Sequence, residues 1–222
     1  MAKTLANELL TAVGMLENDD LETWTLQDLV RYGNDGATDM LNRRPDLFSH
    51  YLDHPLVAGW RQRIPSDGTK LLDVHANAGA NGSKRACTQV DRRYLDAQLR
   101  GWRSLAPVLE VDHFMVDERE PACFDVFPPA AVGAVLSIEY ARRPAVIPIP
   151  APGTLPAAIT GPIPVPDEMS VAWQHYIAFR CFAEGSEDGN AQAARNHISI
   201  YADALGVEIQ ATLLVAPKTS KP

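Results

Sequence analysis

Proline dominates one internal stretch of this sequence, and no other feature limits the possible folds as strongly. Residues 144–166 contain eight of the 17 prolines in the chain. Because proline lacks a backbone N–H and has a fixed φ, this stretch can form neither an α-helix nor a central β-strand. We therefore expect an extended, semi-rigid arm in polyproline-like geometry that separates two folded parts of the chain.

Aliphatic side chains lie between the prolines of this arm, and leaving them in water is unfavourable. The simplest interpretation is a surface loop. The interpretation we favour is that part of the arm packs on a neighbouring subunit. The candidates for this inter-subunit contact are Ile147, Ile149, Leu155, Ile159 and Ile163.

Hydrophobic residues recur at helical spacing in the first 45 residues of the chain and again after the arm. The second of these stretches has the clearest boundaries, because Thr25 and Asp28 have the spacing of a capping box and Pro45 ends the pattern. The predicted helices are residues 5–16, 26–44, 167–183 and 190–205.

Two glycines, Gly33 and Gly36, lie inside the second predicted helix. Each costs roughly 1 kcal/mol relative to alanine in a helix interior. Either the helix bends there, or another backbone passes close to it. We favour the second explanation, which suits a helix that is tightly packed in an assembly.

The middle of the chain has short alternating segments separated by turn residues, which is typical of β-strands. A helix is expected from Thr88 to Leu99, and a Gly/Ala/Asn-rich loop from Asn77 to Ser83. Short links between the last three segments favour an antiparallel meander. The predicted strands are residues 60–65, 71–75, 112–116, 123–127 and 134–140.

Together these elements predict an α+β fold in which helices from both ends of the chain form a four-helix bundle. A β-rich antiparallel domain is inserted into it. The expected parts are a helical bundle (1–50 and 167–212), the inserted domain (56–143), the proline-rich arm (144–166) and an extended C-terminal tail (213–222).

Composition narrows the possible partners. The formal net charge of −8 argues against a broad phosphate-binding face, because such binding depends on Lys and Arg. Three widely spaced cysteines without a CxxC pair indicate reduced thiols and not a disulfide framework or zinc site. No stretch is long and apolar enough to span a membrane, and the N-terminus has no cleavage signature, so we expect a cytoplasmic origin.

Several short patterns resemble chemical sites, but each has a simpler explanation. His50, Asp53 and His54 have part of the spacing of a helical metal site, yet the glutamate of HExxH is missing and Pro55 follows directly. A turn or short helix with surface histidines is the better interpretation. Asp112–His113 and Asp117–Glu118 are expected at a solvated sheet edge, and the 79–84 loop lacks the glycine spacing of a P-loop.

Arginines and aromatic residues are mixed in the middle of the chain, a composition that can bind single-stranded nucleic acid. With a net charge of −8, a sheet core with arginines at a protein interface is the favoured interpretation. The arginines are Arg92, Arg93, Arg100 and Arg103, and the aromatic residues are Trp60, Tyr94, Trp102, Phe114, Phe124 and Phe127.

The order of short motifs along the chain resembles the head–tail adaptor (connector) proteins of tailed bacteriophages. Trp24–Gly36 is similar to a family helix with a tryptophan, a leucine and an Asn-Asp-Gly end, and Val116–Pro129 is similar to a family segment with Asp-Glu-Arg and Pro-Pro. Gly14, the long arm and the tail beyond Leu205 depart from the family pattern. The other matching segments are residues 43–46, 64–72, 89–102 and 189–194.

The resemblance implies a structural protein of the virion neck, assembled in the bacterial host cytoplasm, with no catalytic residue, metal or cofactor. It implies a twelvefold homo-oligomeric ring beneath the portal protein, which extends the DNA channel and docks the next tail protein, a nozzle or tail terminator. Double-stranded DNA would pass through without specific binding, so the lumen should be acidic or neutral, and Glu17–Glu22 is one candidate for it. No membrane contact is implied.

The C-terminal segment combines apolar residues with a cationic end, and resembling adaptors use such an extension to grip the portal. The portal-docking candidates are Val207, Ile209, Leu213, Leu214, Val215, Lys218 and Lys221. Two alternative functions remain open from the sequence. One is a metal-dependent hydrolase that uses His50, Asp53 and His54, and the other is a small nucleic-acid-binding module.

Overall fold

The computed structural model describes residues 3–17, 21–79, 84–184 and 190–208. The chain divides into two compact units. The first, called here the helical unit, is Met1–Arg44 with Pro144–Pro222, and the second, the β unit, is Pro45–Arg143. The proline-rich stretch therefore belongs to the helical unit, and residues 45–50 belong to the β unit.

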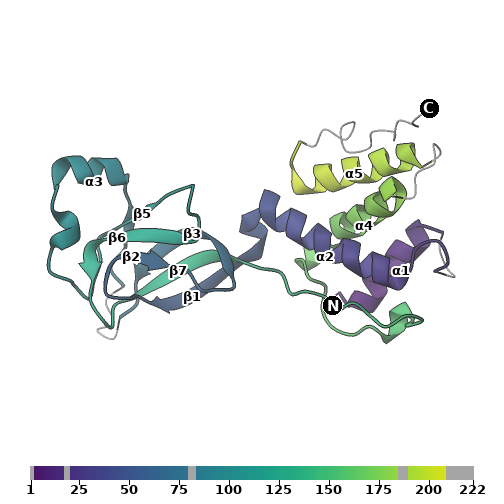
Figure 1. Cartoon of the computed structure of the whole chain (residues 1–222), viewed down its shortest axis with the longest axis horizontal. Helices are drawn as coiled ribbons and strands as arrows, with labels where there is room; N and C mark the ends of the chain where they lie inside the picture. The colour runs from purple at the N-terminus through teal and green to yellow at the C-terminus, as the bar shows by residue number, and fades with distance from the viewer. Residues whose placement is uncertain (1–2, 18–20, 80–83, 185–189, 209–222) are drawn as a thin grey trace, which may run out of the picture. The chain divides into compact units, whose positions relative to one another are not determined.

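The helical unit is built around α4, which contacts α1, α2 and α5 (Figure 1). Its core holds fully buried Leu9, Leu29, Trp173 and Ile177. The predicted helices are confirmed within a few residues at each end. They are α1 (Leu5–Met15), α2 (Leu26–Arg43), α4 (Ser170–Glu184) and α5 (Ala191–Leu205), with short 3-10 turns η3 (Pro156–Ala158) and η4 (Asp167–Met169).

The capping box predicted for α2 is confirmed. The Asp28 backbone N–H donates to Thr25 Oγ1 at 3.3 Å, and the Thr25 backbone N–H donates to Asp28 Oδ2 at 3.2 Å. These two bonds satisfy amide donors that have no partner within the helix. The start of α2 is therefore fixed by its own sequence, and this matters because α2 carries the residues that hold the arm.

The β unit has two sheets that share one hydrophobic core. One sheet has the strand order β1-β7-β3 and the other β2-β6-β5-β4. The strands are β1 (Ser49–Pro55), β2 (Gly59–Arg63), β3 (Gly68–Asn77), β4 (Thr88–Gln89), β5 (His113–Val116), β6 (Cys123–Ala130) and β7 (Val135–Arg142). The helical pieces are η1 (Pro45–Phe48), α3 (Arg92–Gln98) and η2 (Trp102–Ser104).

Three details of the predicted middle are wrong. The meander fails at its second link, because β6 and β7 lie in different sheets, and Pro128 and Pro129 belong to β6 instead of a loop. The predicted helix from Thr88 begins only at Arg92, because Thr88–Gln89 pairs in parallel with β5. Residues 50–54 form neither a turn nor a helix but most of strand β1.

The α+β class is thus confirmed, with five α-helices and two sheets in the described part of the chain. No helix within those ranges is long and apolar enough to cross a membrane.

Candidate assembly surfaces

The two glycines of α2 make room for aromatic rings of α4. A Cβ atom added at Gly33 would lie 2.6 Å from Trp173 Cζ2, and one added at Gly36 would lie 2.7 Å from Tyr176 Cδ1. Trp173 also donates its indole N–H to the Gly33 carbonyl oxygen at 2.8 Å. The expectation of a close neighbour is right, but that neighbour is an aromatic side chain and not a backbone.

Between the glycines, Asn34 binds the proline-rich arm. Its side-chain amide donates to the Ile147 carbonyl oxygen at 2.9 Å, and its Oδ1 accepts the Ile147 backbone N–H at 2.9 Å. Two turns earlier on the same helix, Gln27 Nε2 donates to the Pro150 carbonyl oxygen at 2.9 Å. Because prolines leave this segment few backbone donors, side chains of α2 take the place of a strand partner.

Tyr32 and Asp35 of α2 complete the contact with α4 through Arg180 and Glu184. The Tyr32 hydroxyl donates to Glu184, and Arg180 donates to Glu184 and, at 3.0 Å, to Asp35. The guanidinium also lies 4.9 Å from the centre of the Tyr32 ring. Arg180 and Tyr32 lower the pKa of Glu184, whereas burial and Glu184 raise the pKa of Tyr32. Every residue from Tyr32 to Gly36 therefore contacts α4 or the arm.

The arm presents an apolar surface while part of it is buried in its own unit. Ile147 and Ile163 are only 5% and 7% exposed, and Ile159 is half-buried. Ile149 and Leu155 are 52% and 68% exposed, and Val146, which is 79% exposed, adds to this surface. A recess of about 240 Å³ lies between residues 151–155 of the arm and the start of α2. Of the five proposed contact residues, Ile149 and Leu155 are thus the most accessible to a neighbour.

Most of the portal-docking candidates lie outside the described residues. Val207 is described and half-buried, just after Gly206, whose φ of 64° ends α5. Ile209, Leu213, Leu214, Val215, Lys218 and Lys221 follow the last described residue. Within the acidic run proposed for the lumen, residues 18–20 also lie outside the described ranges.

A pair of histidines joins α4 to α5. The Nδ1 atoms of His175 and His197 are 2.7 Å apart, so one imidazole donates and the other accepts. Phe182 stacks on His197 with the ring centres 5.5 Å apart. Burial lowers the pKa of both histidines, and His175 lowers that of His197 further. Both rings are therefore held in the neutral form more strongly than exposed histidines would be.

We expect the free energy of unfolding of the helical unit to fall on acidification. Below a pH of about 6.5, histidines of the unfolded chain bind protons that the folded pair resists. Stability is complete above that pH and decreases as the pH falls toward the lowered pKa values of the folded state. Urea unfolding at pH values on either side of this window measures the effect.

The matched control for this experiment is His175→Gln/His197→Gln, which should flatten the pH dependence. If the whole chain unfolds in one transition, a residual slope is expected from His54 of the β unit, because burial lowers its pKa as well. An unchanged slope in the double variant would mean that the pair is not the source.

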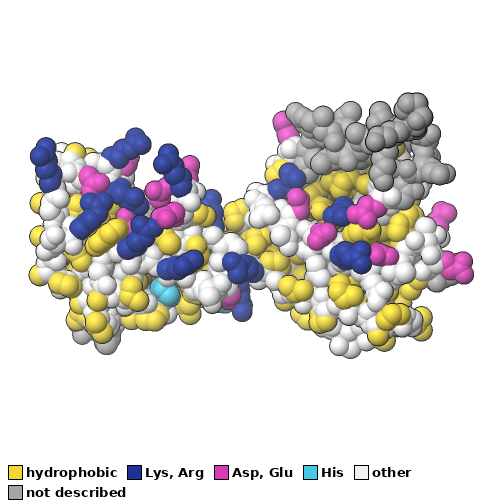
Figure 2. Space-filling model, in the orientation of Figure 1, with side chains coloured by type: hydrophobic (Ala, Val, Ile, Leu, Met, Phe, Trp, Pro, Cys, Tyr) yellow, Lys and Arg dark blue, Asp and Glu magenta, His cyan; other side chains and the backbone are white. Residues whose placement is uncertain are grey.

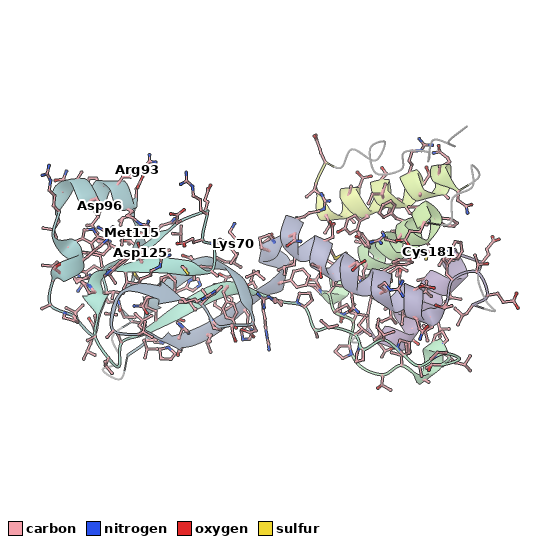
Figure 3. The ribbon with its side chains drawn as sticks, in the orientation of Figure 1. Lys70, Arg93, Asp96, Met115, Asp125 and Cys181 are labelled. Carbon is pink, nitrogen blue, oxygen red and sulfur yellow. The ribbon has the colours of Figure 1, made fainter. Side chains whose placement is uncertain are left out.

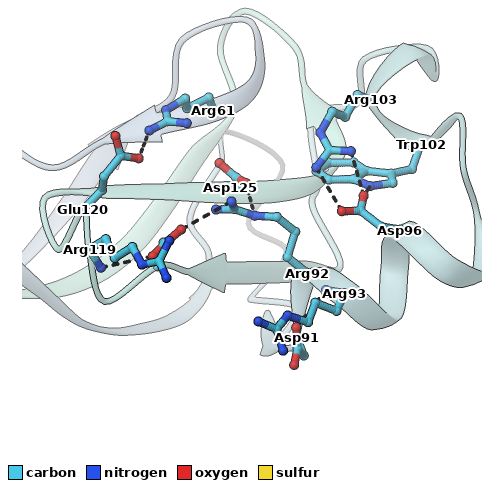
Figure 4. A network of polar contacts seen from close by, with 11 residues as sticks. Arg61, Asp91, Arg92, Arg93, Asp96, Trp102, Arg103, Arg119, Glu120 and Asp125 are labelled. Carbon is cyan, nitrogen blue, oxygen red and sulfur yellow. Dashed lines mark hydrogen bonds and ion pairs between the residues drawn. The ribbon is translucent and has the colours of Figure 1, made fainter.

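An ion-pair network covers one face of the β unit (Figure 4). Arg92 Nε lies 2.9 Å from Oδ2 of Asp125, which is 1% exposed, and its Nη1 lies 3.5 Å from Asp117 Oδ2. Burial raises the pKa of Asp125, and the charge of Arg92 opposes this shift most strongly. Nearby, Arg61 pairs with Glu120 at a more exposed position. Arg92 therefore compensates the one fully buried carboxylate of this network.

The aromatic residues of the middle lie mostly inside the β unit. Trp102 is fully buried between Trp60 and Phe127, with ring centres 6.0 Å and 6.1 Å away, and Phe114 and Phe124 belong to the sheet core. This confirms the sheet-core interpretation for these rings. Tyr94 differs from them, because it is 64% exposed.

The other candidate chemical residues do not form a site. The His54 Nε2–H donates to the Arg63 carbonyl oxygen, while Asp53 points to the opposite face of β1, as strand alternation requires. The metal-dependent hydrolase suggested for His50, Asp53 and His54 is therefore wrong in its geometry. Among the described residues, no three His, Cys, Asp or Glu side chains are grouped to hold a metal ion.

The remaining candidate residues also give no evidence of a catalytic or metal-binding site. His113 accepts or donates at Thr88 Oγ1, and Asp112 pairs with Arg85, so both have local structural partners. Residues 80–83 of the glycine-rich loop lie outside the described ranges. Burial raises the pKa of Cys87 and Cys181 to about 12, which keeps both thiols protonated and unreactive.

Sequence reasoning missed the residues that join the elements of the helical unit. The roles of Asn34 and Arg180 depend on partners more than a hundred positions away, which no local pattern reveals. By contrast, four arginines of residues 84–105 were named in advance as candidates for a protein interface, although the excess of positive charge in this segment was not used. The segment contains six basic and two acidic residues within a chain whose net charge is −8.

Sequence comparisons identify one family for this chain. No curated protein matches the chain significantly. The sequence model of the SU10 adaptor protein family matches residues 4–218, which span both units. The chain therefore belongs to the SU10 adaptor family of bacteriophage structural proteins.

Proposed function

We propose that this adaptor forms a closed, twelvefold ring beneath the portal protein of a tailed phage. The ring extends the DNA channel and provides the docking surface for the next tail protein. In this role the chain is a component of the virion neck and catalyses no reaction.

The observation that carries this proposal is the outer surface of the proline-rich arm. Asn34 and Gln27 fix the arm to α2, yet Val146, Ile149 and Leu155 remain largely exposed. Rigid, exposed aliphatic side chains are unfavourable in a monomer and suit a surface that is covered on assembly. We infer that a neighbouring subunit covers them in the ring.

The distribution of charge supports the passage of DNA without specific binding. The helical unit contains 15 acidic and eight basic residues, whereas the β unit contains 13 and 12. An acidic surface repels the phosphate backbone. A helical unit that contributes to the lumen would therefore let DNA slide. The C-terminal segment from Val207, with its apolar residues followed by Lys218 and Lys221, would grip the portal.

The test is the mass of the purified chain with and without the portal ring of the same phage. We expect a species near 24.3 kDa alone, and portal complexes that gain twelve copies. Ile149→Asp/Leu155→Asp should remain folded by circular dichroism but should prevent ring closure.

The matched control is Val171→Asp, which places a charge at a residue of α4 that is 49% exposed and lies outside the arm. It should assemble normally. A stable small oligomer with no affinity for the portal would contradict the proposed function, and normal assembly of the double variant would contradict the role of the arm.

A further inference from the structure

Residues 84–105, called here the α3 segment, form a basic region in an acidic protein. The segment has six basic residues and two acidic ones, Asp91 and Asp96. Figure 2 shows Lys and Arg side chains gathered over the part of the β unit that carries α3. The basic residues are Lys84, Arg85, Arg92, Arg93, Arg100 and Arg103.

These basic side chains divide into two groups. Arg85, Arg92 and Arg103 pair with Asp112, Asp125 and Asp96 at distances of 3.0, 2.9 and 2.7 Å. Arg93 and Arg100 are exposed and form no ion pair within the described ranges. Figure 3 shows Arg93 on the outer side of α3, and Figure 4 shows it beside Asp91, whose Oδ1 accepts the Arg93 backbone N–H. Two guanidinium groups are therefore available to carboxylates of another molecule.

The α3 segment is held rigidly from inside. Asp96 accepts the Trp102 indole N–H at 2.8 Å and a guanidinium N–H of Arg103 at 2.7 Å. The Arg103 guanidinium lies 4.3 Å from the centre of the Trp102 ring, and Trp102 itself is fully buried. A fixed backbone presents exposed side chains with little loss of conformational entropy on binding.

Apolar side chains accompany the free arginines on the outer surface. Tyr94, Leu99 and Leu105 are 64%, 40% and 41% exposed. Tyrosine and arginine are enriched where protein interfaces have their largest binding energies. The α3 segment therefore has the composition of a protein-binding surface, with apolar contacts surrounded by cations.

A recess borders this surface where β4 ends. It has a volume of about 730 Å³ and is lined by residues 89–93 and 116–119. Strand β4 pairs only with His113 and Phe114, while β5 continues to Val116, which is 39% exposed. Its lining includes three basic residues, Arg92, Arg93 and Arg119, and three acidic ones, Asp91, Asp117 and Glu118, so it can contact charged side chains of either sign.

We propose that the α3 segment docks on the helical unit of a second copy of this chain. The charges are complementary, because the helical unit has an excess of seven acidic residues and the α3 segment an excess of four basic ones. Glu168, Asp203 and Glu208 of the helical unit are exposed and form no ion pair among the described residues. This inference rests on the proposed ring, in which every copy would offer both surfaces.

A second copy fits these observations better than nucleic acid does. Single-stranded binding requires several exposed aromatic rings on which bases stack. Here Trp60, Trp102 and Phe127 pack on one another, and Tyr94 is the one largely exposed ring of the described α3 segment.

Cross-linking of portal-bound rings tests the partner directly. Arg93→Lys and Arg100→Lys keep the positive charge and supply an amine that a zero-length carbodiimide joins to a touching carboxylate. Rings are assembled from a mixture of isotopically light and heavy chains, so that links between copies can be recognised by mass. We expect inter-copy links from positions 93 and 100 to Asp or Glu of the helical unit.

Links that stay within one copy, inter-copy links confined to the β unit, or no links at all would each overturn the inference. These outcomes would not contradict the proposed ring, because the mass measurement tests the ring separately. A wild-type chain that forms no ring on the portal would instead overturn the proposed function, and this inference with it.

Charge reversal gives a second, quantitative readout. Arg93→Glu/Arg100→Glu should raise the chain concentration needed to complete the ring by more than about tenfold, since like charges would face each other. The matched control is Arg63→Glu/Lys70→Glu, which changes the charge equally at exposed residues outside the α3 segment and should assemble normally. Equal effects of the two variants, or tight salt-dependent DNA binding that only the first one abolishes, would contradict docking on a second copy.

Discussion

Replacement of Arg92 by alanine is expected to destabilise the β unit by about 3–5 kcal/mol, because it leaves a buried carboxylate without its cation. The carboxylate is that of Asp125, which is 1% exposed and lies 2.9 Å from the Arg92 guanidinium. Arg61 and Arg103 also lower its pKa, but less than Arg92 does. Urea unfolding of the folded variant measures the loss.

The matched control is Arg61→Ala. Arg61 pairs with Glu120 on the same face, but their side chains are 41% and 52% exposed. Water screens this pair, so its loss should cost far less stability than the loss of Arg92. Equal destabilisation by the two substitutions would show that the burial of Asp125 is not what makes Arg92 important.

Acidification provides an independent check on the same carboxylate. Burial raises the pKa of Asp125 in the folded protein, and loss of Arg92 should raise it further. A carboxyl group whose folded pKa lies above its unfolded value destabilises the protein at neutral pH, and this penalty vanishes below the unfolded value of about 3.9. The difference between Arg92→Ala and wild type should therefore shrink as the pH falls.

The sequence predicted those parts of the fold whose causes are local. The capping box of Thr25 and Asp28 and the stop at Pro45 involve residues within one helix and its boundaries, and α2 has the expected limits. Residues 144–166 form neither an α-helix nor a strand of either sheet, only the short 3-10 turn η3, as the backbone chemistry of proline predicts. The sheet-core position of Phe114 and Phe124 follows from strand alternation.

The predictions were wrong where the local structure depends on a strand that is distant in the sequence. Strand β1 pairs only with β7 and leaves most of its side chains exposed on both faces, so its own sequence has no alternating pattern. Strand β4 has two residues and exists because β5 lies beside it. The short link between β6 and β7 led to the prediction that these two strands pair with each other. An equally short link can instead join strands of two different sheets that pack face to face.

The same distinction applies to the assembly surfaces. The aliphatic residues of the arm were recognisable from composition, but which of them face outward depends on Asn34 and Gln27 of α2. The basic excess of residues 84–105 was visible in the sequence. Which arginines remain available was not, because Arg85, Arg92 and Arg103 are distinguished from Arg93 and Arg100 only by folded neighbours.

Gly33→Ala and Gly36→Ala are each expected to destabilise the helical unit by about 1–3 kcal/mol, because the added methyl group would overlap an aromatic ring of α4. The new Cβ atoms would lie 2.6 Å from Trp173 and 2.7 Å from Tyr176. Trp173 is fully buried and donates to the Gly33 carbonyl oxygen, so its ring has no free direction in which to move. The better helix propensity of alanine offsets at most about 1 kcal/mol of this cost.

Gly14→Ala is the matched control, because Gly14 also lies in a helix but has no heavy atom within 4 Å of the added Cβ. That substitution should stabilise the helical unit by up to about 1 kcal/mol, through helix propensity alone. The same chemical change is thus expected to have opposite signs at Gly14 and Gly33, and thermal unfolding of the three variants measures them together. Stabilisation by Gly33→Ala would mean that α2 and α4 are not in close contact. That contact also positions Asn34 against the arm. Without it, the arm would lack the fixed surface on which the proposed assembly depends.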